Sequence, residues 1–149
     1  MGGSFARGGR YREIVIDGRY RDNPELTAGI LSHEVGHAVY QVPVDSSSRE
    51  AFINSYLADE GAATLSNIRF SREVAQASDG SISVPVLGSS ANIPVYNAVY
   101  DHYLSRGDAA FAHKAIGSIY RNGETTSIDG QTYSEYYGAI YDSWKKGTE

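Results

Sequence analysis

The chain contains no cysteine among its 149 residues. Disulfide bonds and thiolate metal ligands are therefore excluded, and any transition-metal site must use nitrogen and oxygen donors from histidine, aspartate and glutamate. The whole chain has only four histidines. A metal site built from this sequence would have to use some of these four side chains.

Long apolar runs are also missing. No segment approaches the roughly 20 apolar residues that a membrane-spanning helix needs, and the N-terminus lacks the apolar segment of a signal peptide. We therefore expect no membrane span. The opening "MGGS" resembles an artificial leader joined to an internal fragment of a longer protein, and we expect residues 1–9 to be such a leader or disordered.

An excess of positive charge is absent as well. Thirteen lysines and arginines stand against eighteen aspartates and glutamates, which gives a net charge of -5. A protein that binds nucleic acid through the phosphate backbone needs a basic face. Nucleic acid is therefore not expected as a partner.

Aromatic residues other than tyrosine are scarce, with one tryptophan and four phenylalanines against twelve tyrosines. Tyrosine suits half-buried surfaces, where its ring packs and its hydroxyl stays hydrated. We expect a tyrosine-lined cleft or interface.

The length and the 41% hydrophobic content fit one globular domain spanning residues 1–149. We predict a mainly helical α+β fold, because one β-branched run near the N-terminus is followed by several capped segments with helical spacing. Ser47 and Glu50 form a predicted capping box for the second of these helices. The predicted elements are a strand at 11–17, helices at 24–40, 51–70, 95–104, 108–120 and 134–146, and a loop with one weak strand at 76–94.

The stretch "LSHEVGHAV" at residues 31–39 contains the motif H-E-x-x-H. On a helix, His33 and His37 lie on one face a turn apart, so both imidazoles can reach the same metal ion. Glu34 is offset from them by one residue, which places it to take a proton from a metal-bound water as the general base. Gly36 within the motif predicts a close approach by another segment, because glycine is unfavourable in a helix.

The alternative is that His33 and His37 have no catalytic role and are ordinary histidines on an amphipathic helix that packs through its apolar side chains. Those side chains are Leu26, Ile30, Leu31, Val35 and Val39.

A catalytic zinc site takes three protein ligands, and the acidic pair in "YLADEGAAT" at residues 56–64 offers the third. Asp59 and Glu60 are about 100° apart around a helix, so only one can face the ion well. We choose Glu60, because small residues follow on its face and its side chain reaches further, and expect Asp59 to be a partner of a ligand at most. Thr64, one turn after Glu60, could orient it through a hydrogen bond. The alternative is a solvated acidic pair.

The two motifs together resemble the gluzincin branch of zinc metallopeptidases, the thermolysin-like and aminopeptidase-like families. The resemblance covers residues 30–64 and implies one zinc ion per chain on His33, His37 and Glu60, with Glu34 as the catalytic base. Asp59 stands where these families often have asparagine. The implied fold is a minimal zincin-like domain with a short N-terminal β element, an HExxH helix, a second metal-ligand helix and a helical C-terminal half.

The small size and the single-domain build resemble the metallopeptidase toxin domains of bacterial polymorphic and secreted effector proteins. This resemblance implies a protein or peptide substrate, a larger parent toxin chain and a cognate immunity protein as partners. It also implies delivery as a secreted effector into the periplasm or cytoplasm of a target cell. Two other functions stay open, a zinc amidase acting on cell-wall peptides and a binding module without turnover.

Peptide hydrolysis usually needs a second donor for the oxyanion that forms in the attack. The gluzincin resemblance implies a histidine or tyrosine from the C-terminal half. The candidates are His102, His113, Tyr133, Tyr136 and Tyr137.

Overall fold

The computed structural model describes residues 3–8, 11–127 and 129–147. Within these residues the chain is mainly helical, as predicted, with five α-helices and one antiparallel β-hairpin. None of the described helices combines the length and the apolar character needed to cross a bilayer. The elements are β1 (Gly3–Gly8), β2 (Tyr11–Ile16), α1 (Pro24–Val39), α2 (Arg49–Ala77), α3 (Ile93–Arg106), α4 (Ala109–Gly123) and α5 (Tyr133–Lys146).

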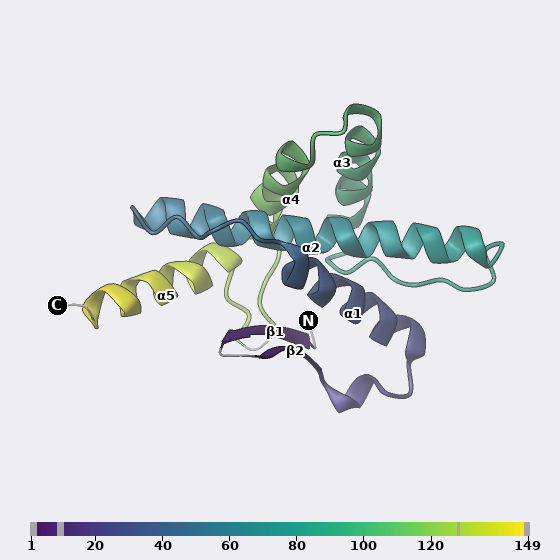
Figure 1. Ribbon diagram of the computed structural model, residues 1–149, viewed down its shortest axis with the longest axis horizontal. Helices are drawn as coiled ribbons and strands as arrows, with labels where there is room; N and C mark the ends of the chain where they lie inside the picture. The colour runs from purple at the N-terminus through teal and green to yellow at the C-terminus, as the bar shows by residue number, and fades with distance from the viewer. Residues whose placement is uncertain (1–2, 9–10, 128, 148–149) are drawn as a thin grey trace.

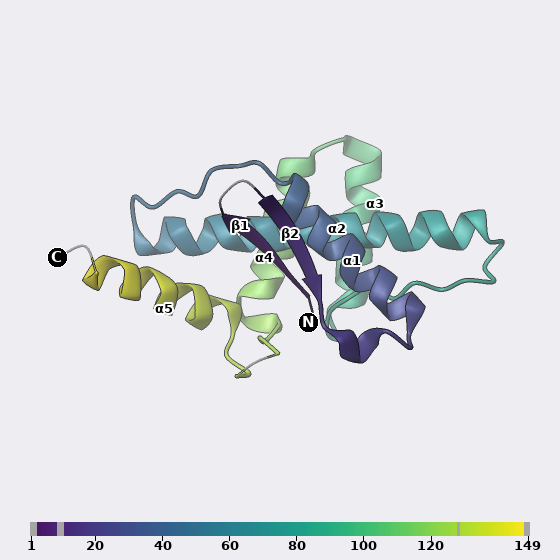
Figure 2. The same ribbon diagram turned by 60° about the horizontal axis from the view of Figure 1, so that its bottom comes forward.

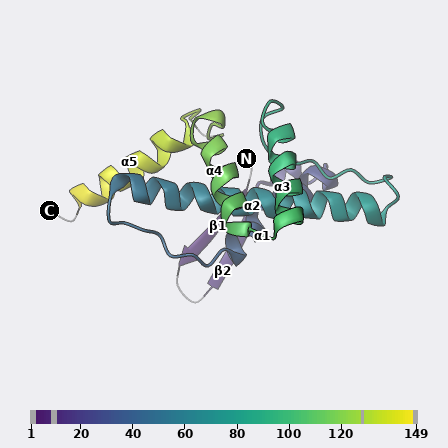
Figure 3. The same cartoon turned by 90° about the horizontal axis from the view of Figure 1, so that it is seen from above.

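Helix α2 is the central element and runs along the long axis of the molecule (Figure 1). Helices α3 and α4 lie on one side of α2, whereas α1 and the hairpin lie on the other (Figures 1 and 3). The hairpin contacts α1, and Figure 2 shows it lying along that helix. One long helix is therefore packed on both sides and can present side chains to each layer.

Glycines set how closely α2 approaches its two main neighbours. A Cβ atom at Gly36 of α1 would lie 2.5 Å from the Cα atom of Ala63 in α2. A Cβ atom at Gly61 of α2 would overlap the carbonyl oxygen of His113 in α4, and one at Gly117 of α4 would overlap the carbonyl oxygen of Leu57. The close approach predicted at Gly36 is confirmed.

The helix starts follow local capping, with one shift from the prediction. Asn23 caps α1 by accepting a hydrogen bond from the Leu26 backbone, and Pro24 occupies the first turn. For α2 the predicted box of Ser47 and Glu50 is wrong, because the cap is Ser48, whose hydroxyl accepts from the Ala51 backbone. The Ser47 backbone donates to Asp45 instead, which closes a local turn and moves the cap by one residue. The helix begins two residues before and ends seven residues after the predicted range of 51–70.

The structure describes part of the N-terminal segment. Gly3–Gly8 form a strand that pairs with β2 from Gly3 opposite Ile16 to Gly8 opposite Tyr11, and an artificial leader over residues 1–9 stays a prediction. Residues 1, 2 and 9 lie outside the described residues. Glycine has a low strand propensity, and backbone pairing with β2 overrides it.

The segment between α2 and α3 is a loop, but the weak strand predicted in it is wrong, since residues 78–92 contain none. Side chains of α2 hold this loop in place. The amide of Asn67 accepts a hydrogen bond from the Leu87 backbone at 2.8 Å and donates to the Pro85 carbonyl at 3.2 Å. The Leu87 N–H and the Pro85 carbonyl are thus paired with a side chain, where a strand would pair them with another strand.

The expected tyrosine-lined cleft or interface is wrong for the largest group of tyrosines, because five of them are buried in the core among α2, α3, α4 and α5. The hydroxyls of Tyr96, Tyr120 and Tyr137 make hydrogen bonds to polar side chains. Tyr96 donates to Glu124 at 2.9 Å, and Thr64 donates to Tyr120 at 3.1 Å. The five are Tyr96, Tyr100, Tyr120, Tyr133 and Tyr137.

We predict that Gly117→Ala lowers the free energy of unfolding by about 1–2 kcal/mol net, because overpacking usually costs about 1–3 kcal/mol. The added Cβ atom would collide with the α2 backbone at Leu57, and this outweighs the gain of about 1 kcal/mol in helix propensity. Gly18→Ala is the control, because nothing lies within 4 Å of its Cβ position. Urea denaturation measures both, and a Gly117→Ala protein as stable as the parent would contradict the close packing of α2 and α4.

Candidate metal centre

Helix α1 turns its polar motif inward together with Ile30, while three of its five apolar side chains face outward and Leu26 is half-buried. Ser32, His33, Glu34 and Gly36 are buried. The apolar side chains Leu31, Val35 and Val39, expected to pack if the histidines were merely structural, are 39% to 67% exposed. Burying histidine and glutamate in place of valine is costly unless these groups interact with one another or with a ligand.

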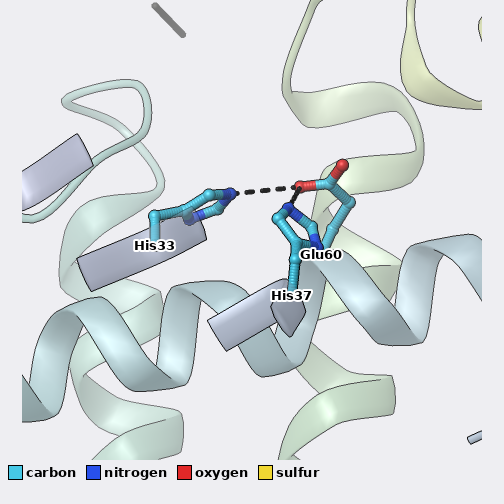
Figure 4. A group of neighbouring side chains, drawn as sticks. All are labelled: His33, His37 and Glu60. Atoms are coloured by element: carbon cyan, nitrogen blue, oxygen red, sulfur yellow. Dashed lines mark ion pairs between the residues drawn. The ribbon is translucent and has the colours of Figure 1, made fainter. Parts of the chain in front are cut away.

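The inward face of α1 meets Glu60 of α2, and the three side chains converge (Figure 4). One carboxylate oxygen, Glu60 Oε2, lies 3.4 Å from His33 Nε2 and 3.6 Å from His37 Nε2. One donor atom from each residue lies within 4.8 Å of the others. His33 and Glu60 are only 1% and 6% exposed, so these two side chains are shielded from solvent.

Two of the three donor separations are compatible with a metal ion such as zinc. Ligands at about 2.0–2.1 Å from a tetrahedral metal are separated from one another by about 3.3–3.4 Å, close to the two distances from Glu60 Oε2. This buried oxygen has no hydrogen-bond partner within the described part of the chain, which is unusual for a buried carboxylate. Two nitrogens and one oxygen with a free lone pair at this spacing could hold a metal ion.

Asp59 contacts the far side of one histidine. Its Oδ1 lies 2.9 Å from His37 Nδ1, so a proton on Nδ1 is shared with the carboxylate and Nε2 is left to face Glu60. Burial alone would lower the pKa of His37, but Asp59, Glu60 and Glu34 together raise it. Asp59 therefore orients His37. This contact agrees with the sequence-based expectation that Asp59 is at most a partner of a metal ligand. His33 lacks such a partner, since its buried Nδ1 has none among the described residues.

The second carboxylate oxygen of Glu60, Oε1, forms a hydrogen bond with a residue of α5. Tyr137 donates its hydroxyl proton to Glu60 Oε1 at 2.6 Å. Burial would raise the pKa of Glu60, but the facing His33, the charge of His37 and the Tyr137 hydrogen bond together lower it. Glu60 is therefore held as a carboxylate. This contact could not be predicted from the sequence pattern, because the two residues are 77 positions apart.

Glu34 lies beside the three converging groups and is 4% exposed. Burial raises the pKa of its carboxyl, while His33 and His37 act against that shift. A carboxylate whose pKa is raised toward neutrality is a better proton acceptor than an ordinary surface glutamate. The structure therefore places a candidate base next to the candidate ligands.

Two expectations about α2 need correction. Thr64 does not orient Glu60, because its hydroxyl donates to Tyr120. The small residues after Glu60 also serve both neighbours of α2 and not α1 alone, since Gly61 faces α4 while Ala63 faces Gly36. The helical repeat alone could not tell which small residue faces which neighbour.

The candidate oxyanion donors lie in different surroundings. His102 is exposed and contacts the Phe111 ring, and Tyr136 is also exposed. His113 is half-buried against Tyr40, with ring centroids 5.4 Å apart. Tyr133 is buried, and burial together with the charges of Glu60, Glu124 and Glu34 raises the pKa of its hydroxyl. Among the five candidates, Tyr133 and Tyr137 are therefore the tyrosines that lie near the acidic group.

Comparison with protein-family models, with curated proteins and with solved structures finds no significant match for this chain. The resemblance to gluzincins therefore depends on the motif residues and their arrangement.

We predict that Glu60→Ala lowers zinc affinity by orders of magnitude, whereas Asp59→Ala costs at most about 10- to 100-fold, the usual effect of a residue that orients a ligand. Glu60 faces both imidazoles, while Asp59 contacts only the outer nitrogen of His37. Zinc titration against a competing chelator measures both, with the exposed Glu73→Ala on the same helix as control. Loss of metal from Asp59→Ala with retention by Glu60→Ala would reverse the assignment.

Proposed function

We propose that this chain is a zinc-dependent metallopeptidase, in which His33, His37 and Glu60 hold the ion and Glu34 is the general base. One observation carries the proposal. Helix α1 buries His33 and Glu34 next to the buried carboxylate of Glu60, with His37 half-buried beside them, and leaves Val35 and Val39 exposed. A helix stabilised only by apolar packing would be expected to bury these valines and expose the histidine and glutamate side chains.

The order of the elements supports the same proposal. A hairpin precedes the motif helix α1, the helix α2 carries Glu60, and the C-terminal part is helical. This order is the one that the resemblance to gluzincins implies. The net charge and the absence of a membrane-spanning helix among the described residues are compatible with a peptide substrate.

Each residue has a distinct task in this mechanism. A zinc ion bound at the site would supply a Lewis acid and lower the pKa of its water to about 7. Glu34 accepts a proton from the attacking water and returns it to the amine that leaves when the peptide C–N bond breaks. Asp59 keeps the proton of His37 on Nδ1, so that Nε2 remains a ligand.

We predict that the purified protein binds about one zinc per chain and that His33→Ala and His37→Ala each abolish binding, because two remaining ligands hold the ion too weakly. Metal analysis after dialysis measures the zinc content. His102→Ala is the control, since His102 is exposed on α3. Equal zinc content in the parent and in the His33 and His37 variants would contradict the metal site.

We predict that Glu34→Gln keeps the zinc but loses most peptidase activity, because the amide preserves the shape of the side chain and cannot accept the proton. Hydrolysis of casein by the zinc-loaded proteins measures this. Glu25→Gln, the same change at an exposed position of α1, should be as active as the parent.

A Glu34→Gln protein as active as the parent would show that the base lies elsewhere. Purified peptidoglycan is the second substrate in the same assay. Hydrolysis of peptidoglycan without hydrolysis of casein would replace the peptidase proposal by a cell-wall amidase.

A further inference from the structure

The two oxygens of Glu60 have different surroundings. Oε1 accepts the hydroxyl proton of Tyr137 at 2.6 Å. Oε2 faces the Nε2 atoms of His33 and His37 and accepts no hydrogen bond from the described residues. Oε1 is therefore bound to a partner on α5, whereas Oε2 faces the two histidines of α1 (Figure 4).

We infer that Tyr137 is a positioning residue that restricts Glu60 to binding the metal through Oε2 alone. The inference rests on the proposed zinc site. A carboxylate without other contacts can rotate and bind a metal through either oxygen or both. A short hydrogen bond from a hydroxyl to a charged oxygen is among the stronger ones in proteins. It occupies Oε1 and fixes the plane of the group, which leaves one coordination position for water.

The position of Tyr137 is itself fixed by packing against α2. Its ring stacks on Tyr56, one turn before Glu60, with centroids 4.7 Å apart and planes 21° apart. Only 7% of Tyr137 is exposed. The hydroxyl therefore approaches Glu60 from a ring that packing holds in one orientation.

An ion pair holds α5 next to this ring. The guanidinium of Arg49, at the start of α2, lies against the α5 backbone at Gly138, where a Cβ atom would collide with it. Arg49 Nε lies 3.0 Å from Asp142, one turn further along α5. The docking of α5 on α2 thus places the Tyr137 hydroxyl where Glu60 can accept its proton.

The chain offers a matched control at the neighbouring position. Tyr136 is on the same helix but 37% exposed, and its hydroxyl makes no hydrogen bond to the described residues. Tyr136→Phe removes the same atom as Tyr137→Phe without affecting Glu60. A difference between the two variants therefore reports the contact with Glu60 and not the loss of a hydroxyl from α5.

The test compares the parent, Tyr137→Phe and Tyr136→Phe after loading with zinc or with Co²⁺. Zinc affinity is measured by chelator competition, and the coordination number by the visible absorption of Co²⁺, which is more intense for four ligands than for five. We expect Tyr137→Phe to lose about 10- to 100-fold in zinc affinity and to show weaker cobalt absorption, because the second oxygen joins the metal. Tyr136→Phe should match the parent in both.

Denaturation of the metal-free proteins separates positioning from a merely structural role. A structural role would lower the metal-free stability of Tyr137→Phe and leave its cobalt spectrum unchanged, which would overturn the inference. Affinity and spectrum equal to those of Tyr136→Phe would also overturn it, while metal binding by the parent would leave the zinc site standing. A parent protein that binds no metal would overturn both.

A crystal structure of the zinc-loaded parent is a second test that needs no variant to fold. We expect Oε2 of Glu60 on the metal and Oε1 still bonded to Tyr137. Both oxygens on the metal, or a Tyr137 hydroxyl turned away from Glu60, would overturn the inference.

Discussion

The interaction on which this molecule depends is the one between the buried carboxylate of Glu60 and the two imidazoles of α1. Removing a carboxylate from water is costly unless charged or hydrogen-bonding partners replace the water. Here the partners come from two layers, His33 and His37 from α1 on one side and Tyr137 from α5 on the other. The close approach of α1 and α2 at Gly36 and Ala63 makes such short distances between their side chains possible.

This constraint accounts for two features of the fold that packing alone does not explain. Helix α1 exposes Val35 and Val39 because its opposite face must reach Glu60. The core beyond Glu60 is rich in tyrosine, and a tyrosine ring fills apolar space while its hydroxyl can donate to a buried acceptor. Tyr96 does this for Glu124 as Tyr137 does for Glu60. Two of the core tyrosines therefore donate to carboxylates, one buried and one half-buried.

The sequence was informative where the physics is local. Capping residues and helical spacing predicted the helices, including α1, whose observed bounds are Pro24–Val39, and the i, i+4 spacing predicted that His33 and His37 share a face. It failed where partners are distant in the chain. The β1 strand depends on pairing with β2, and the Tyr137 contact depends on how α5 docks. Asp59 and Glu60 point in directions about 100° apart around α2. How α2 packs against α1 determines which of them faces the two histidines.

Burial of the site affects both chemistry and access. Electrostatic interactions among Glu34, His33 and Glu60 are stronger away from water, and the raised pKa of Glu34 is a direct result of that burial. The same burial blocks a peptide, because Glu34 and His33 are almost fully covered and only His37 is partly open. For the proposed hydrolysis of a peptide bond at Glu34, a segment that covers α1 or α2 would have to move aside, and the regions of a fold with few buried contacts are those that open at least cost.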